Sequence, residues 1–337
     1  MKTTTIGLDL AKNVFHVVGL DHRNKEVLKK KLKRSDVLPF FSRLEVTDVA
    51  MEACSGAHYW GRELEKQGHR AKLIPPRAVK PYVQGNKNDY NDALAIAEAS
   101  KRPKLRLVKV KTVPEQDRQA LHRLKEGAVQ QRTQLCNQIR GLLREYGITP
   151  PLRVSGLIQS IPRILEDAEN GLSDDFRLSL SEVYQQLMEV TGHIEAYQRR
   201  IVAGARANEV ERRLQTIPGF GPVVSSAYHA AVGDGRAFRR GRDVSSYLGL
   251  VPRQHSTGGK TVLLGISKRG NRYVRSLLVH GARAVVRVAP QKKDRLSRWV
   301  TGLVAHRGKN KATVALANKL ARIGWAVISS GGAYQAQ

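Results

Sequence analysis

The sequence is poor in cysteine, in long apolar runs and in acidic residues. Its 337 residues include only two cysteines, Cys54 and Cys136, in different segments. Two isolated cysteines exclude a disulfide framework and indicate a reducing compartment. No apolar stretch approaches the roughly 20 residues that a helix needs to cross a bilayer, and the N-terminus lacks the apolar core of a signal peptide. We therefore expect a cytoplasmic protein that does not enter a membrane.

Acidic side chains are outnumbered two to one. Lysine and arginine total 58 against 29 aspartates and glutamates, which gives a formal net charge of +29. The excess is uneven, because residues 201–337 hold 24 basic and only 5 acidic side chains. An imbalance of this size favours a polyanionic partner, most simply nucleic acid. We expect the last third of the chain to carry the main nucleic-acid surface.

The first 110 residues combine short strand patterns with helix patterns. Two strands around a turn at Lys12-Asn13 are expected within residues 3–21, and a third strand at 25–32. Helix and strand patterns then alternate, with Ser35 as the expected N-cap of the first helix. These later segments span residues 35–44, 46–53, 57–69, 70–76 and about 89–99. The order predicts an α/β domain with a mixed sheet.

Long helix patterns follow, at about 115–146 and 179–205. The second pattern spaces its apolar residues by three and four, which is a heptad seam. The residues of this seam are Leu180, Val183, Leu187, Val190, Ile194, Tyr197 and Ile201. The seam fits either an antiparallel hairpin within one chain or a coiled coil between subunits.

The length and composition allow two domains and a connector, because 41% of the residues are hydrophobic. The last part of the chain is basic and dense in glycine over 212–290, and it ends in an amphipathic helix pattern at 311–331. We divide the chain into an α/β domain at 1–112, a segment of long helices at 113–210 and a mainly helical basic domain at 211–337.

Four carboxylates stand out by their positions. Asp9 ends the first strand pattern and Glu52 ends the fourth. Asp89 and Asp92 lie one helical turn apart at the start of an alanine-rich helix, so both face the same way. Carboxylates that converge from strand ends and a nearby helix can bind Mg²⁺, and two such ions can clamp a phosphodiester. Taken singly, each acid also fits an ordinary turn or helix-cap residue.

A second group of candidate residues lies in the segment "VPRQHSTGGKTVLLGISKRGN", residues 251–271. Two hydroxyls, Ser256 and Thr257, precede Gly258-Gly259 in what we expect to be a flexible loop. The cations around them are Lys260, Lys268, Arg269 and Arg272. A hydroxyl in this setting could attack a phosphate whose developing charge the cations stabilise, or the loop could only grip phosphate. The spacing is not that of a Walker A loop.

Two further features are typical of nucleic-acid binding. Residues 214–234 resemble a helix-hairpin-helix whose "PGFGP" turn, with Gly219 and Gly221, would point backbone N–H groups at a phosphate. An ordinary helix–turn–helix core is the alternative. A basic strip also links the first two segments, and a solvated linker explains it equally well. Its residues are Lys101, Arg102, Lys104, Arg106, Lys109 and Lys111.

Together these motifs resemble one family, the DEDD insertion-sequence transposases, which are bridge-RNA-guided serine recombinases of bacterial mobile elements. The resemblance runs from about residue 4 to residue 330. The matching segments are "IGLDLAKNVFHV", "MEACSGAHYW", "NKNDYNDALAIAE", "IPGFGPVVSSA", "SYLGLVPRQHSTGGK" and "ISKRGNRYVRSLLVHGARA".

The resemblance implies a RuvC-like (RNase H-fold) N-terminal domain, a coiled-coil segment and a C-terminal transposase domain. It implies that Asp9, Glu52, Asp89 and Asp92 bind Mg²⁺, with Mn²⁺ as a substitute. It also implies that a serine forms a phosphoserine bond with DNA, in an active site shared between subunits. Family members place this serine directly before a glycine, where Thr257 stands here. We assign Ser256 and keep Thr257 as the alternative, because spacing from "VPR" favours 257 and spacing from "ISKRG" favours 256.

The partners implied are double-stranded target and donor DNA, a structured noncoding guide RNA and further copies of the chain in a tetramer built as a dimer of dimers. Guide-RNA pairing would leave the protein to contact phosphates and nucleic-acid shape, which fits its charge. Two alternatives remain: a RuvC-like metal-dependent nuclease without a covalent intermediate, and a non-catalytic binding protein with structural acids. The expected location is the bacterial cytoplasm.

Overall fold

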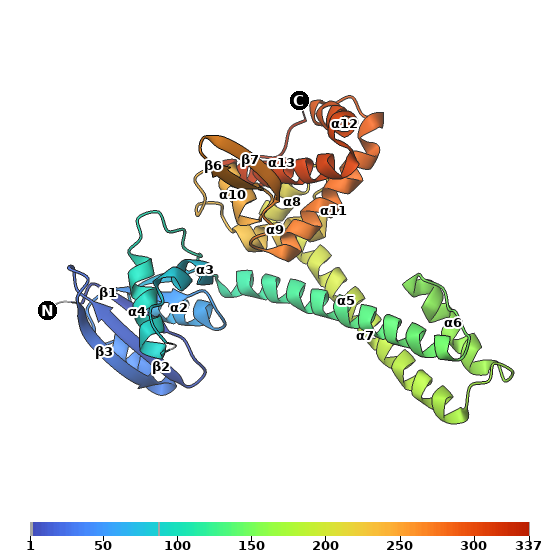
Figure 1. The fold of residues 1–337 in the computed structure, drawn as a ribbon, viewed down its shortest axis with the longest axis horizontal. Helices are drawn as coiled ribbons and strands as arrows, with labels where there is room; N and C mark the ends of the chain where they lie inside the picture. Colours follow the sequence, from blue (N-terminus) through green and yellow to red (C-terminus); the bar gives the residue numbers. More distant parts are fainter. Residues whose placement is uncertain (1–2, 87, 337) are drawn as a thin grey trace. The chain divides into compact units, whose positions relative to one another are not determined.

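The computed structural model describes residues 3–86 and 88–336, which form two compact units (Figure 1). The first unit comprises Met1–Gln116 together with the short segment Gly235–Arg239. The second comprises Asp117–Asp234 and Arg240–Gln337. Among the described helices, none combines the length and the apolar character that crossing a bilayer requires.

The first unit contains a five-stranded mixed sheet with the strand order β3-β2-β1-β4-β5. Strands β1, β2 and β3 are antiparallel neighbours, whereas β4 runs parallel to β1 and β5 runs parallel to β4. The mixed sheet expected from the sequence is therefore confirmed. The strands are β1 (Thr5–Asp9), β2 (Val14–Leu20), β3 (Glu26–Lys33), β4 (Asp48–Glu52) and β5 (Arg70–Ile74).

Helices cover both faces of this sheet. Alternate residues of a strand point to opposite faces, so Ile6 and Leu8 pack in one core with Trp60 and Leu64 of α2. Residues of the opposite face, such as Val18 and Ala50, pack against α4 instead. The helices of this unit are α1 (Val37–Phe41), α2 (Ala57–Lys66), α3 (Pro76–Val79) and α4 (Asp89–Ser100), with 3₁₀ turns η1 (Arg34–Asp36) and η2 (Lys80–Tyr82).

One local prediction was wrong in detail, and one alternative for Asp89 does not hold. Ser35 does not cap a helix, because it lies inside the 3₁₀ turn η1 and its hydroxyl donates to Asp36 Oδ1. Asp89 is not the N-cap of α4, because Asn88 takes that place and its Oδ1 accepts a 2.9 Å hydrogen bond from Tyr90 N. The N-cap of α4 is therefore Asn88, and Asp89 and Asp92 are acids of the first turn of the helix.

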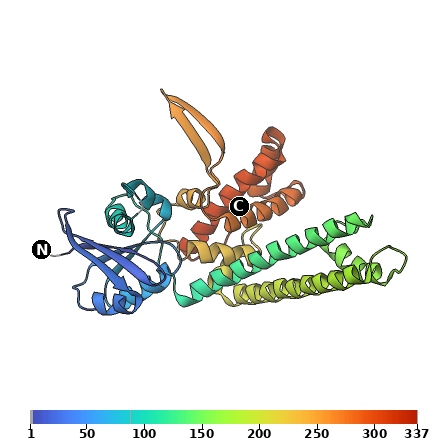
Figure 2. The same cartoon turned by 60° about the horizontal axis from the view of Figure 1, so that its bottom comes forward.

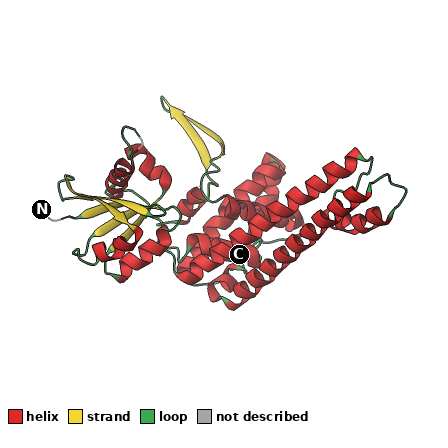
Figure 3. Cartoon of the chain, turned by 90° about the horizontal axis from the view of Figure 1, so that it is seen from below, coloured by secondary structure: helices red, strands yellow, loops and turns green. Residues whose placement is uncertain are grey.

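Over its described residues, the second unit is helical apart from one β-hairpin, as Figure 3 shows. The helix α5 begins in the first unit and continues through most of its length in the second. The elements are α5 (Val113–Glu145), α6 (Val154–Glu166), α7 (Asp174–Ala207), α8 (Glu209–Leu214), α9 (Pro222–Val232), α10 (Gly241–Tyr247), β6 (Pro252–Thr257), β7 (Lys260–Ile266), α11 (Arg272–Val288), η3 (Ala289–Gln291), α12 (Arg295–Arg307) and α13 (Lys309–Ser330).

The heptad seam of α7 packs within the chain. Its residues Leu187, Val190 and Ile194 share a core with Leu135 and Ile139 of α5, and α6, which the sequence analysis did not identify, closes the end of this core. The structure thus matches the intrachain hairpin. Pairing of these helices between subunits remains a prediction.

The expected flexible loop at 251–271 is instead the hairpin β6–β7 (Figure 2). Gly258 and Gly259 form its two-residue turn with φ values of 54° and 77°, and a turn with two positive φ values matches the twist of paired strands. Every residue of β6 and all of β7 except Ile266 are exposed. The hairpin therefore lacks the apolar-in, polar-out alternation that reveals most strands.

Candidate active site

The acids of the first unit converge because of the strand register and because alternate residues of a strand face opposite sides of the sheet. Asp9 and Glu52 end the neighbouring parallel strands β1 and β4. Asp9 has the same parity as Gly7, and Glu52 has the same parity as Ala50, which packs on α4. Both carboxylates therefore lie on the face of the sheet that α4 covers, at the end where Asp89 and Asp92 occupy the first turn of that helix.

An unusually close contact brings α4 to the sheet. A Cβ added to Gly7 would lie 2.0 Å from the carbonyl oxygen of Ala93 and 2.8 Å from the backbone nitrogen of Ala97. The backbone of α4 thus lies directly on β1, which only glycine on the strand and small residues on the helix allow. This contact explains why the helix is rich in alanine, and it sets the height of its acidic first turn above Asp9.

The electrostatics of this group favour a bound cation. Burial raises the pKa of Asp9 to about 6, with further contributions from Asp92, Asp89 and Glu52, which outweigh the lowering effect of His16. Burial and then Asp92 also raise the pKa of Glu52. A bound divalent cation would offset this repulsion between the carboxylates. Mg²⁺ prefers oxygen ligands of this kind. The residues present therefore fit a metal site.

His16 joins this group, and the sequence analysis missed it. Asp9, His16 and Asp89 each place one ligand atom within 4.8 Å of the other two, and His16 Nδ1 lies 3.5 Å from Asp89 Oδ2. Glu52 and Asp92 act on the pKa of Asp9 but are not members of this three-residue group of ligand atoms. The available signal was a single polar residue inside the otherwise apolar strand "VFHVVGL".

In the second unit, the two candidate hydroxyls lie on opposite faces of the hairpin. Ser256 pairs across the strands with Thr261, and Thr257 pairs with Lys260. Because parity alternates along a strand, Ser256 shares its face with Gln254, whose Nε2 donates a 2.7 Å hydrogen bond to Ser256 Oγ. Thr257 shares the opposite face with His255. The one-residue choice between the hydroxyls is therefore a choice between two different chemical surroundings.

The root of the hairpin is held rigidly. A Cβ on Gly249 would lie 2.0 Å from the carbonyl oxygen of Arg269, and one on Gly270 would lie 1.9 Å from that of Tyr247. Arg275 Nη1 donates to the Leu248 and Arg269 carbonyl oxygens. The predicted phosphate-binding cations Lys260, Lys268, Arg269 and Arg272 are all exposed around this fixed root and the hairpin tip.

The turn between α8 and α9 is built into the core of the second unit. Gly219, with φ 84°, packs its backbone against Gly281 of α11, where a Cβ on Gly219 would lie 2.8 Å from the Gly281 carbonyl oxygen. Phe220 is buried against the Tyr228 ring. By contrast, a Cβ on Gly221 would meet no atom within 4 Å. Of the two predicted glycines, Gly221 is therefore the one with open space beside it.

The residues of the basic strip after α4 differ in their contacts within the protein. Lys101 Nζ donates to the Asp21 carbonyl oxygen at 3.0 Å and to Asn24 Oδ1 at 2.6 Å, so it ties α4 to the β2–β3 turn. Arg106 is exposed but its guanidinium lies 5.4 Å from the centre of the Phe238 ring, and two further residues of the strip are exposed as well, Arg102 and Lys104. These last two are the members best placed to meet a polyanion.

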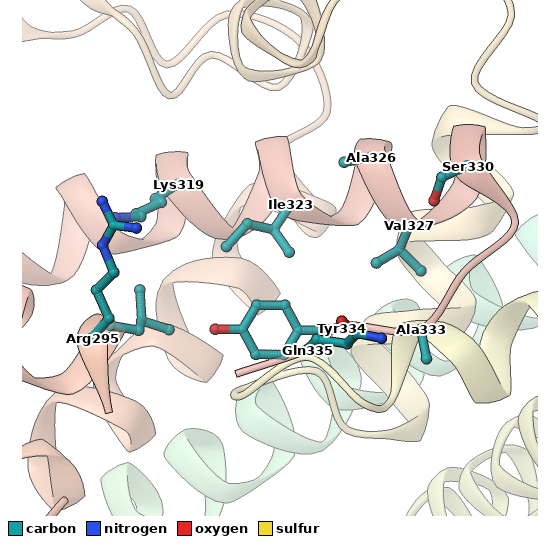
Figure 4. A pocket seen from close by; sticks show the side chains of 10 residues that line it. Arg295, Lys319, Ile323, Ala326, Val327, Ser330, Ala333, Tyr334 and Gln335 are labelled. Carbon is teal, nitrogen blue, oxygen red and sulfur yellow. The ribbon is translucent and has the colours of Figure 1, made fainter. Parts of the chain in front are cut away.

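A groove of about 380 Å³ runs along α13 in the second unit (Figure 4). Its floor is apolar, with Ile323 and Val327, and the Tyr334 ring of the C-terminal segment lies across from them. Arg295 and Lys319 stand at one end, and burial and neighbouring arginines lower the pKa of the Lys319 ammonium. The groove therefore combines an apolar floor with two cations at one end.

Comparisons with known proteins agree with this geometry. Residues 6–148 match the family model for DEDD transposases of the IS110 type, described as "Transposase", and residues 211–297 match the model described as "Transposase IS116/IS110/IS902 family". The first match covers Asp9, Glu52, Asp89 and Asp92, and the second covers Ser256 and Thr257.

Full-length relatives are also similar. The chain is 46% identical to a "Probable family 20 transposase" of Pseudomonas aeruginosa over 99% of both proteins. It is 44% identical to the "Transposase for insertion sequence element IS1111A" of Coxiella burnetii, over 98% of this chain and 91% of that one. It is 38% identical to the "Transposase for insertion sequence element IS1328" of Yersinia enterocolitica, over 97% of each. The chain belongs to the IS110/IS116 family of insertion-sequence transposases, which are enzymes acting on DNA.

Proposed function

We propose that this transposase cuts and rejoins DNA through a covalent phosphoserine intermediate, guided by a structured RNA that pairs with target and donor DNA. The observation that carries the catalytic part is the crowding of Asp9, Asp89 and His16 within 4.8 Å in one unit, together with a hydroxyl on an exposed basic hairpin in the other. A basic hairpin alone would fit a protein that only grips phosphate, whereas the group of acids in the first unit is not expected of such a protein.

The acids hold the metal in this proposal. Asp9, Glu52, Asp89 and Asp92 would bind Mg²⁺, with Mn²⁺ as a substitute. When bound, the ion would stabilise negative charge on the oxygens of the scissile phosphate. Glu52 and Asp9 end the neighbouring strands β4 and β1, so pairing within the sheet fixes the backbone from which both carboxylates project.

Ser256 supplies the nucleophile. Its Oγ would form a bond to phosphorus while the bond from phosphorus to the deoxyribose oxygen breaks. The serine proton goes to water, and the departing deoxyribose oxygen takes up a proton. The reverse attack by a deoxyribose hydroxyl would restore the DNA strand, so the phosphodiester energy is conserved and no nucleotide cofactor is needed. The exposed Lys260, which follows the Gly258-Gly259 turn in the paired strand, would suit the charge that develops on the phosphate.

The assembly we propose is a tetramer in which acids of one subunit act with the serine of another. The family resemblance is the support for this arrangement and for the guide RNA. The exposed position of every β6 residue agrees with it, because the hydroxyl is accessible to a partner. The excess of basic residues in the last third of the chain provides phosphate contacts that need no base readout.

A denaturing gel with a suicide DNA substrate tests this proposal. Purified protein, RNA transcribed from the flanks of its element, Mg²⁺ and labelled DNA would be compared for the wild type, Ser256→Ala and Thr257→Ala. A protein–DNA adduct lost only in Ser256→Ala supports the proposal as written, and loss only in Thr257→Ala moves the nucleophile by one residue. Cleavage without any adduct would favour the alternative, a RuvC-like metal-dependent nuclease in which water attacks.

A further inference from the structure

We propose that His16 is a nitrogen ligand of the divalent cation held by Asp9 and Asp89, and that it tunes the site toward Mn²⁺ relative to Mg²⁺. This inference rests on the metal site of the proposed function. It concerns a residue outside the four acids, on a strand that contributes none of them. The argument starts from the place of His16 in the sheet.

Strand register places His16 beside Asp9. The two residues are directly paired partners on the antiparallel strands β1 and β2, and side chains of paired residues lie on the same face. His16 has the parity of Val18, which packs under α4. Its imidazole is thus directed to the face on which α4 begins with Asp89.

The distances suit a single metal ion. Ligand atoms in an octahedral site with bonds of about 2.1 Å lie about 3.0 Å apart when adjacent and about 4.2 Å apart when opposite. The 3.5 Å from His16 Nδ1 to Asp89 Oδ2 falls between these values. Because the atoms of Asp9, His16 and Asp89 lie within 4.8 Å of one another, small side-chain movements would complete the geometry.

Burial and an aromatic neighbour fix the position of the His16 imidazole. The His16 side chain is 10% exposed, against 59% for Asp89. The ring of Tyr90 meets the His16 ring edge to face, with 4.7 Å between the ring centres, and Lys29 Nζ lies 4.7 Å from the centre of the same Tyr90 ring. A buried imidazole locked by an aromatic neighbour and facing carboxylates is a preorganised ligand rather than a mobile surface group.

The chemistry of the donor set gives the metal preference. Mg²⁺ prefers carboxylate oxygen and water, whereas divalent transition-metal ions, of which Mn²⁺ is the weakest binder, accept an imidazole nitrogen more readily than Mg²⁺ does. A site with two carboxylates and one imidazole should therefore discriminate more strongly between these ions than a site made of carboxylates alone. The competing explanation is that His16 only forms an ion pair with Asp89 and steadies α4. That role predicts no bond between nitrogen and metal.

Electron paramagnetic resonance on the full chain with Mn²⁺ separates these explanations without DNA or turnover. In the wild type, we expect electron spin-echo modulation from a directly bound histidine nitrogen, which changes when the protein is grown with ¹⁵N-histidine. Absence of this coupling in wild-type protein that binds Mn²⁺ would overturn the inference. This measurement needs no variant and is therefore independent of any folding defect.

Variants then test the preference. His16→Gln should weaken Mn²⁺ binding by at least about tenfold, because losing a direct ligand should cost no less than losing an outer-shell partner. Mg²⁺ binding, measured by competition, should weaken by a smaller factor. His22→Gln, at an exposed position in the β2–β3 turn, is the matched control and should change neither. Equal weakening for both ions would overturn the role in selectivity.

Asp9→Asn separates this inference from the proposed function. If Asp9→Asn weakens Mn²⁺ binding and His16→Gln does not, the acidic site stands and only the role of His16 fails. If Asp9→Asn leaves Mn²⁺ binding unchanged, the proposed metal site itself fails. Circular dichroism spectra of each variant confirm that the comparison is made on folded protein.

Discussion

The acidic site and the hydroxyl-bearing hairpin are built in opposite ways. The acids of the first unit depend on close packing, because Asp89 and Asp92 reach Asp9 only where the backbone of α4 touches Gly7. The hairpin of the second unit depends on turn chemistry, because its strands are exposed along their length and Gly258-Gly259 joins them. Substitutions in the first site should therefore change folding and activity together, whereas those in the hairpin should change activity alone.

The largest expected effect is that of Asp9→Asn on DNA cleavage. Asp9 is the carboxylate on which the charges of the other three acids act, so its neutralisation should lower the cleavage rate by more than about 100-fold, beyond the loss typical of an outer-shell metal partner. The rate is measured on labelled DNA, with RNA transcribed from the flanks of the element, under single-turnover conditions. Cleavage within tenfold of the wild type would show that Asp9 does not hold the metal.

Gly7→Ala should break the packing on which the acidic site depends. The new methyl group would meet the Ala93 carbonyl oxygen, so α4 must move, and we expect a loss of about 1–3 kcal/mol in the free energy of unfolding, together with weaker Mn²⁺ binding. Urea denaturation and Mn²⁺ titration measure the two effects. Gly141→Ala is the matched control. It lies in the α5 helix with open space around it and should stabilise the protein by up to about 1 kcal/mol.

The contrast between the two sites also marks the limit of sequence reasoning. All five strands of the mixed sheet and the helices α4, α5, α7 and α13 could be predicted, because their apolar periodicity and their turn residues are local. The positions of Asp9 and Glu52 at strand ends followed from the same patterns. What local patterns cannot contain is the contact between Gly7 and Ala93, which joins residues 86 positions apart in the sequence.

Two features of the sites were missed for other physical reasons. The strands β6 and β7 bury neither face, so they lack the alternation of polar and apolar residues, and the segment was expected to be a loop. His16 is a lone polar residue in an apolar strand, and only the register with Asp9 and the position of α4 show what it faces. In both cases the missing information was tertiary.

Gly258→Ala combined with Gly259→Ala should test the hairpin side of the comparison. Each alanine in a left-handed conformation costs about 1–2 kcal/mol, so the turn should open and covalent adduct formation should fall by more than about tenfold. The thermal unfolding midpoint should change little, because the strands pair mainly with each other. Gly258→Asn alone, which keeps a favoured turn of the same type, should retain adduct formation. A large fall in the unfolding midpoint would mean that the hairpin supports the fold.

Stability without metal should depend on pH through the acidic site. The pKa of Asp9 is about 6 in the folded protein against 3.8 for the free side chain, so the folded state holds more protons between these values. Asp9 therefore costs no stability below about pH 4, and its unfavourable effect grows as the pH rises through 6. After allowance for solvent screening, Asp9→Asn should remove about 1 kcal/mol of this decline. Urea titrations at pH 4.5 and 7.5 in EDTA measure it, with Ser256→Ala as the variant that should match the wild type.

The smallest effect concerns which face of the hairpin reacts. If Ser256 is the nucleophile, Gln254→Ala removes the hydrogen bond to its Oγ and should slow adduct formation several-fold, since one such bond contributes about 0.5–1.5 kcal/mol. His255→Ala changes the neighbouring residue on the opposite face, where Thr257 lies, and should slow it less. Both residues are exposed on β6, so neither change should affect folding. If His255→Ala slowed adduct formation more than Gln254→Ala, the result would favour Thr257 as the nucleophile, because His255 lies on the same face as Thr257.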